Sequence, residues 1–220
     1  RALLQRRHYL SRVGTGPVWL GAWAAPTTPA TAATAAAATP TAAIAPLRGT
    51  GDLGVVVARA TGTLAIVSTS ERAVLAQVTG LGDLSHASVV FSRDARFAYV
   101  FGRDGALTKV DLLTQQIAAR VVQAGNSIGG AISADGTLVV AQNYTPGGIK
   151  VFDAATLKLL ADVPAEYAPG QRSRVVGLAD LPGRRFVYSL FDAGEIWISD
   201  FSNPAQPSTI KIKNIGRQPY

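Results

Sequence analysis

Two stretches decide the fold, VVFSRDARFAYVF (89–101) and GAISADGTLVVAQ (130–142), which begin 41 residues apart. Each holds a short apolar, β-prone run, a tight polar turn and a second apolar run. A looser copy is VGLADLPGRRFVYSLF (176–191), and GVVVARATGTLAIVS (54–68) is interpreted as an earlier, degenerate copy. Short runs of this kind separated by turn residues predict β-hairpins.

A second half-repeat alternates with the first. Its copies are AIVSTSERAVLAQV (65–78), ALTKVDLLTQQIAARVV (106–122), GIKVFDAATLKLLADVP (148–164) and GEIWISDFSNPAQPSTIKI (194–212). We interpret the recurring Asp111, Asp153 and Asp200 as turn formers rather than catalytic acids. Two hairpins per repeat give a four-stranded sheet, which must stack on its neighbours to bury both faces. The pattern therefore predicts an all-β chain, a β-propeller with about four blades. A β-sandwich with accidental internal similarity is the alternative.

The composition of the chain excludes several classes of protein and of metal site. The chain has 220 residues, of which 48% are hydrophobic and 16% charged, and this excludes bulk disorder. It has no cysteine, which excludes disulfides, thiolate metal sites, Fe–S clusters and c-type haem attachment. The net charge is +7, but residues 1–46 contribute four arginines and no acid. The remaining basic residues are scattered, so we expect no nucleic-acid partner.

The first 46 residues differ from the rest. Arg6-Arg7 precede VGTGPVWLGAWAA (13–25), which is too short to span a membrane. We predict a twin-arginine-type export signal over 1–25 and a periplasmic location, with a fortuitous basic amphipathic N-terminus as the alternative. Residues 26–46 are an Ala/Thr/Pro low-complexity linker, and 47–220 are the propeller domain. The chain starts at Arg1 and stops after GRQPY, so we expect roughly half of a larger ring.

Longer strings carry a family resemblance. They include LRGTGDLGVVVARA, GLGDLSHASVVFSRDARFAYVFGRDGALTKVDLL, GNSIGGAISADG, NYTPGGIKVFDAATL, SRVVGLADLPG, SLFDAGEIWISDF and IGRQPY. In order, and over nearly all of 47–220, they closely resemble the N-terminal half of the NirF family of haem d1 biosynthesis proteins. The resemblance implies an eight-bladed propeller related to the d1-haem domain of cytochrome cd1 nitrite reductase.

The resemblance implies that His86, in LSHASVV, is both the axial ligand of the haem iron and the catalytic residue. Neutral imidazole is a good axial ligand for haem iron. His86 is the one histidine after the linker. A satisfied structural histidine in a loop is the alternative.

Further ligand contacts are expected around it. Haem d1 carries several carboxylates, which guanidinium groups bind well, and the candidates are Arg59, Arg103, Arg172 and Arg174. Each could equally be a solvated surface arginine. Tyr144 matches a tyrosine beside the haem in the reductase, where it could donate a hydrogen bond or only pack. Asn126 and Ser127, in GNSIGG, match a polar pair there, although this chain lacks the arginine of that pair. Gly129-Gly130 could let the backbone approach a flat ligand or merely form a bulge.

The resemblance implies a periplasmic oxidoreductase that binds dihydro-haem d1 and dehydrogenates a propionate side chain to an acrylate. Haem d1 or its dihydro precursor is then substrate or product, and the electron acceptor and general base are not identified. A non-catalytic haem d1 carrier, the d1 domain of the nitrite reductase and an unrelated interaction propeller are the alternatives. Other d1-maturation proteins and the nitrite reductase are the expected protein partners.

Overall fold

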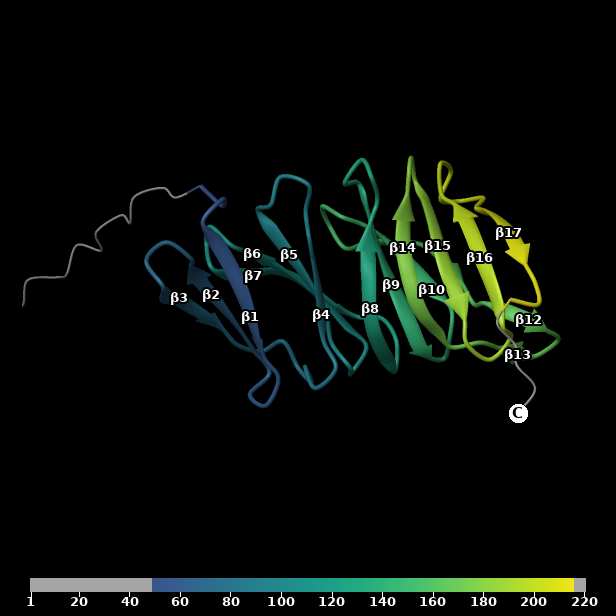
Figure 1. Ribbon diagram of the computed structural model, residues 1–220, viewed down its shortest axis with the longest axis horizontal. Helices are drawn as coiled ribbons and strands as arrows, with labels where there is room; N and C mark the ends of the chain where they lie inside the picture. Colours follow the sequence, from purple (N-terminus) through teal and green to yellow (C-terminus); the bar gives the residue numbers. More distant parts are fainter. Residues whose placement is uncertain (1–48, 216–220) are drawn as a thin grey trace, which may run out of the picture. The chain divides into compact units, whose positions relative to one another are not determined.

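The computed structural model describes residues 49–215, and every regular element in that range is a β-strand. The expected export signal (1–25) lies outside the described residues, as does the linker (26–46). Four antiparallel sheets follow one another along the chain, as Figure 1 shows from β1 to β17. No helix in the described range is long and apolar enough to cross a membrane.

Each sheet is an up-and-down meander in which neighbouring strands pair in chain order. Sheet 1 consists of β1 (Leu53–Ala58), β2 (Thr63–Ser68) and β3 (Ala73–Val78). Sheet 2 consists of β4 (Ser88–Phe91), β5 (Phe97–Phe101), β6 (Ala106–Asp111) and β7 (Gln116–Val122). Sheet 3 consists of β8 (Asn126–Ile132), β9 (Leu138–Thr145), β10 (Ile149–Asp153) and β11 (Leu159–Val163).

Sheet 4 consists of β14 (Val175–Leu181), β15 (Arg185–Leu190), β16 (Glu195–Asp200) and β17 (Ser208–Ile212). A small hairpin of β12 (Glu166–Ala168) and β13 (Gln171–Arg172) lies in the connection before it. Three four-stranded sheets and one three-stranded sheet confirm the all-β, blade-by-blade prediction.

The core lies between the sheets. Successive strand residues point to opposite faces of the sheet, and in β9 the residues on both faces are buried. Leu138 and Val140 pack toward sheet 4, whereas Val139 and Ala141 pack toward sheet 2. A further cluster joins sheets 1 and 2. Each sheet therefore depends on its neighbour for burial, as the repeat predicted.

Sheet 1 corrects one part of the repeat assignment. The β5–β6, β9–β10 and β15–β16 turns each contain a positive-φ glycine: Gly105, Gly148 and Gly194. The β1–β2 turn contains Gly62, with φ 63°. Residues 54–68 therefore correspond to the second and third strands of a sheet, and not to its first hairpin. The expectation failed because the segment AIVS (65–68) fits both half-repeats.

The strand directions give the sheets two distinct ends. We call the end at which β4, β8 and β14 begin the entry end. Backbone hydrogen bonds join its loops: Arg103 N donates to Asp83 O at 2.8 Å, and Gly148 N donates to Ser173 O at 3.2 Å. The opposite end, with the β4–β5, β8–β9 and β10–β11 turns, is called the far end.

Candidate functional site

His86 lies at the entry end, in the loop between β3 and β4. Leu81 and Leu84 anchor this loop in the core, where they are 0% and 1% exposed. Asp83 shapes the segment just before the histidine, because its Oδ1 accepts a hydrogen bond from Ser85 N at 2.8 Å. Hydrogen bonds from Ser85 lower the pKa of Asp83, which keeps this acceptor ionised.

The imidazole itself is exposed. No hydrogen bond or ion pair ties it to any residue within 49–215. An exposed ring on a loop fixed by two buried leucines is available to an external ligand. The alternative for His86 was a structural histidine whose ring is hydrogen-bonded within its loop. No such bond is found within residues 49–215.

Arg103 is the predicted arginine beside this loop. Its backbone N–H bonds to Asp83 O, while its side chain is exposed. The arginine also contributes to lowering the pKa of Asp83 through its charge. His86 and Arg103 are thus brought to neighbouring loops of one sheet.

Tyr144 and Arg174 form a second group at the entry end, on sheets 3 and 4. Arg174 Nη1 donates to the Tyr144 hydroxyl at 3.1 Å. The guanidinium carbon lies 5.0 Å from the centroid of the Tyr144 ring and 4.4 Å from that of Phe191. Asp192 completes the group with an ion pair to Arg174 at 2.5 Å. The hydrogen bonds between the two raise the pKa of Arg174 and lower that of Asp192.

Asn126 and Ser127 have different environments although they are adjacent on β8. Ser127 is fully buried and its hydroxyl donates to Gln142 O at 2.9 Å, so it stabilises the sheet internally. Asn126 Oδ1 is buried without a hydrogen-bond partner, and so are Ser88 Oγ and Gln142 Oε1. Buried polar atoms are normally paired, which makes these three candidates for contact with water or a ligand.

Gly129 and Gly130 are explained by packing. The pairing of β8 with β9 shifts between Ser127 and Gly129, which is a bulge. A Cβ on Gly129 would lie 2.9 Å from Ser88 Oγ, and one on Gly130 would lie 2.2 Å from Phe101 Cζ. The irregularity lies at Ile128, just before the two glycines, which pair in register with Gln142 and Ala141.

Arg59 and Arg172 are exposed and make no ion pair with another described residue. Arg59 follows β1 in the turn that corresponds to that of Arg103, and Arg172 ends the small β12–β13 hairpin. The structure thus brings the predicted arginines to the same end of the sheets without placing these two in contact with His86.

Sequence reasoning missed Asp192, Phe191, Ser88 and Gln142. Asp192 and Phe191 lie in SLFDAGEIWISDF, whose FDAG turn has no feature that distinguishes it from other turns. Ser88 and Gln142 are ordinary strand residues, and only their unpaired, buried oxygens identify them.

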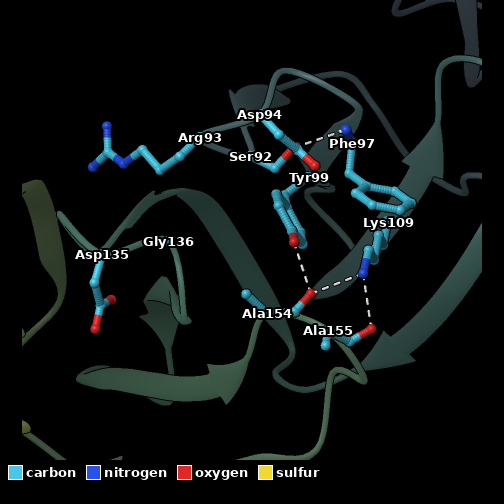
Figure 2. Close-up of a pocket in the computed structure, with 10 residues that line it drawn as sticks. All are labelled: Ser92, Arg93, Asp94, Phe97, Tyr99, Lys109, Asp135, Gly136, Ala154 and Ala155. Atoms are coloured by element: carbon cyan, nitrogen blue, oxygen red, sulfur yellow. Dashed lines mark hydrogen bonds between the residues drawn. The ribbon is translucent and has the colours of Figure 1, made fainter.

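A cavity of about 320 Å³ at the far end contains none of the predicted residues. Figure 2 shows Lys109 and Tyr99 hydrogen-bonded to the neighbouring backbone carbonyls. Lys109 Nζ donates to Ala154 O at 3.0 Å and to Ala155 O at 2.8 Å, and lies 4.0 Å from the Phe97 ring centroid. Tyr99 also donates to Ala154 O, at 2.7 Å. These contacts join sheet 2 to the β10–β11 turn.

Stacked antiparallel sheets define a propeller-type domain, and an exposed histidine and several arginines at one end make its loops the candidate ligand site. Residues 48–220 match the family model described as "Cytochrome D1 heme domain", so the chain belongs to that family.

Within the family, the chain is similar to the proteins named NirF. It is 62% identical to "Protein NirF" of Pseudomonas aeruginosa and 61% identical to that of Stutzerimonas stutzeri, each over 177 residues. Each match covers 80% of this chain and 45% of the relative, within the relative's N-terminal portion. The chain thus spans less than half the length of these relatives. The NirF resemblance predicted from the sequence is confirmed.

A protein described as a dehydrogenase is a more distant relative. The "Dihydro-heme d1 dehydrogenase" of P. aeruginosa is 36% identical over 130 residues, which are 58% of this chain and 26% of that protein. Among solved structures, "Dihydro-heme d1 dehydrogenase NirN in complex with DHE" matches with a TM-score of 0.66 and 32% identity. That match covers 73% of this chain and 35% of the other.

Proposed function

We propose that the chain is part of a periplasmic haem d1 biosynthesis protein that binds dihydro-haem d1 and oxidises a propionate side chain to an acrylate. The observation that carries the proposal is His86, an exposed imidazole without a described partner on an anchored loop. It occurs in a member of the cytochrome d1 haem family. In this proposal its ring is the axial ligand of the iron.

The entry end suits a flat, carboxylate-bearing ligand. Arg103 lies on the loop beside His86, and Arg59 and Arg172 have exposed guanidinium groups at the same end. The unpaired buried oxygens of Asn126, Ser88 and Gln142 offer further polar contacts. Guanidinium groups favour carboxylates, and a paired buried oxygen is more stable than an unpaired one.

The oxidation removes two hydrogens, as two protons and two electrons, from the propionate. A base must lie within hydrogen-bond reach of the proton that it removes, and an acceptor from outside the chain must take the electrons. His86 cannot ligate the iron and act as this base at once.

A non-catalytic carrier or assembly factor is the second candidate, and one observation favours it. Two carboxylates at the described entry end, Asp83 and Asp192, have lowered pKa values and are held by hydrogen bonds. Such groups are poor bases near neutral pH. A carrier would pass haem d1 to other maturation proteins or to the nitrite reductase.

Turnover separates the two candidates. The full-length protein is incubated with dihydro-haem d1 and an electron acceptor, and the tetrapyrrole is then extracted for mass spectrometry. If the protein is an oxidoreductase, we expect each protein molecule to remove two hydrogens from many tetrapyrrole molecules. We also expect His86→Ala to lose this activity. A bound tetrapyrrole of unchanged mass would contradict the dehydrogenase and support the carrier.

A further inference from the structure

The loop that carries His86, residues 79–87, is bonded through its backbone to the β5–β6 turn of sheet 2. Arg103 N donates to Asp83 O at 2.8 Å. The next residue of the turn contacts the same aspartate, because Asp83 N donates to Asp104 Oδ2 at 3.4 Å. Both backbone groups of Asp83 are therefore held by two successive residues of one turn.

Arg120 on β7 joins Asp104 to an earlier residue of the loop. Its Nη2 lies 3.3 Å from Asp104 Oδ2 and donates to Leu81 O at 3.5 Å. The Asp104 carboxylate is also fixed within its own turn, since its Oδ1 accepts a hydrogen bond from Ala106 N at 3.1 Å. The side chains of Arg120 and Asp104 are 30% and 32% exposed, so solvent screens their attraction only in part. We call these two side chains the loop clamp.

Gly82 leaves the space that the clamp occupies. It has φ 88°, and a Cβ there would collide with Asp104 Oδ2 and lie 2.9 Å from Arg120 Nη2. Gly80, in the same loop, has φ 81° and nothing within 4 Å of a Cβ. The positive φ favours glycine at both positions. Of the two, only Gly82 is a position where a methyl group would displace the clamp.

The imidazole of His86 depends on this loop for its position. The ring is exposed and makes no hydrogen bond or ion pair with a residue within 49–215. Backbone donors on both sides of it are bonded, because Ser85 N donates to Asp83 Oδ1 at 2.8 Å and Ala87 N donates to Leu84 O at 3.2 Å. The direction of the ring is therefore set by the backbone that the clamp holds at Asp83.

We propose that Asp104 and Arg120 are positioning residues, which hold the His86 loop so that the imidazole meets the tetrapyrrole iron in one orientation. The proposal rests on the proposed function, in which His86 is the axial ligand. Groups outside the coordination sphere commonly orient a ligating histidine. Here they act through the backbone of the loop, and neither clamp residue is assigned a contact with the tetrapyrrole.

The test uses the full-length protein, with purified ferric haem d1 as the probe. Asp104→Asn removes the charge of the clamp, whereas Gly82→Ala keeps both clamp residues and displaces them. We expect each variant to raise the Kd from absorbance titration about fivefold, the effect of losing one partly exposed ion pair that holds the binding conformation. Arg120→Lys keeps the charge opposite Asp104 and should raise Kd less.

Two further readouts distinguish positioning from a loss of stability. We expect altered or broadened g-values in the electron paramagnetic resonance spectrum of the ferric complex, because the axial imidazole influences the iron and its orientation is no longer fixed. Hydrogen exchange of the ligand-free protein reports on the loop without haem. The amides of residues 81–87 should exchange about fivefold faster in Asp104→Asn and in Gly82→Ala.

Two variants are matched controls. Gly80→Ala introduces the same backbone strain into the same loop without reaching the clamp. Asp180→Asn breaks the ion pair with Arg93, whose side chains are also partly exposed, at the far end. Both should keep the Kd and g-values of the unaltered protein, and Asp180→Asn should also leave the exchange of residues 81–87 unchanged.

Unaltered Kd and g-values in Asp104→Asn and Gly82→Ala would overturn the inference, even with faster exchange, and would leave the proposed function intact. Equal changes in Gly80→Ala and Gly82→Ala would also overturn it, because strain in the loop would then explain them. Failure of the unaltered protein to bind haem d1 would overturn the proposed function, and the inference with it.

Discussion

Among single residues, Gly105 shows most clearly how one position fixes the entry end. It adopts φ 81° in the β5–β6 turn, and its carbonyl accepts a hydrogen bond from Gln123 N at 2.9 Å. A Cβ here would lie 1.8 Å from Ala124 O, a backbone atom that cannot rotate away. Glycine is therefore required for the conformation and also for the close approach of two loops.

Gly105→Ala should lower the free energy of unfolding by about 3 kcal/mol or more, from backbone strain together with the collision. Gly80 is a matched control because it has the same φ of 81° but nothing within 4 Å of a Cβ. Gly80→Ala should cost only about 1 kcal/mol, from backbone strain alone. Denaturant unfolding of both variants measures the difference, and equal losses would refute the role assigned to the loop contact.

At the scale of elements, a buried lysine links sheet 2 to sheet 3. Lys109 on β6 is 5% exposed and its ammonium bonds to the carbonyls of Ala154 and Ala155 in the β10–β11 turn. Burial lowers the pKa of Lys109, although nearby carboxylates oppose this effect. The two carbonyls and the Phe97 ring compensate for the loss of hydration of the charge.

Lys109→Met keeps the apolar stem and removes the ammonium. We expect a loss of about 1–3 kcal/mol in the free energy of unfolding, because the hydrogen bonds to two carbonyls disappear. Lys158→Met, at an exposed position of the same turn, should change stability by less than about 0.5 kcal/mol. Chemical denaturation compares the two, and a neutral Lys109→Met would show that the linkage does not stabilise the stacking of the sheets.

The elements also show what a single sequence can predict. The hairpins of sheets 2, 3 and 4 were predictable because their turns recur, with Ala95, Gly136 and Gly183 all at positive φ. Asp111 and Asp153 bond to backbone N–H groups of their own turns, as expected of turn formers. Sheet 1 was predicted out of phase, because the shared AIVS segment fits either half-repeat.

The candidate site was predictable only in part, for a physical reason. His86 and the arginines stand out by residue type, and the repeat brings their loops to one end. The pairing of Arg174 with Asp192 joins residues 18 positions apart, and its bond to Tyr144 joins residues 30 positions apart on another sheet. Such contacts depend on the register and stacking of the sheets. Neither local pattern nor composition specifies them.

At the scale of the whole molecule, ion pairs and hydrogen bonds join sheets 2, 3 and 4 at the far end. Arg93 on the β4–β5 turn bonds to Ser133 O at 3.0 Å and to Asp180 on β14 at 2.9 Å. Arg184 Nε bonds to Asp135 Oδ2 at 2.8 Å, which links sheet 4 to sheet 3. The three sheets are thus joined by charge as well as by their apolar clusters.

These contacts make stability depend on pH. Burial raises the pKa of Asp135, but hydrogen bonds from Ser133, Arg184 and Thr137 outweigh it and lower the pKa overall. A lowered folded-state pKa stabilises the protein above the unfolded-state pKa of about 4, and this contribution disappears as the pH falls below that value. Because both partners are partly exposed, we expect about 1 kcal/mol from Asp135.

Unfolding in denaturant at pH 7 and pH 3 measures this effect. The unaltered protein should lose more stability on acidification than Asp135→Asn, which has no carboxylate to protonate. The same loss in both proteins would show that Asp135 makes no such contribution.

The export prediction also concerns the whole chain. Arg6-Arg7→Lys-Lys should retain the protein in the cytoplasm, because the twin-arginine pair is read by a receptor. Cell fractionation and immunoblotting provide the measurement. Unchanged export would contradict a twin-arginine signal in residues 1–25.

The central claim is that His86 ligates the iron of a d1-type tetrapyrrole. Titration of haem d1 into the full-length protein and into His86→Ala, followed by absorbance in the Soret region, tests it most directly. We predict a saturable Soret shift in the unaltered protein, and a loss of that shift with at least about tenfold weaker binding in His86→Ala. Identical Soret changes and affinities in the two proteins would contradict the account.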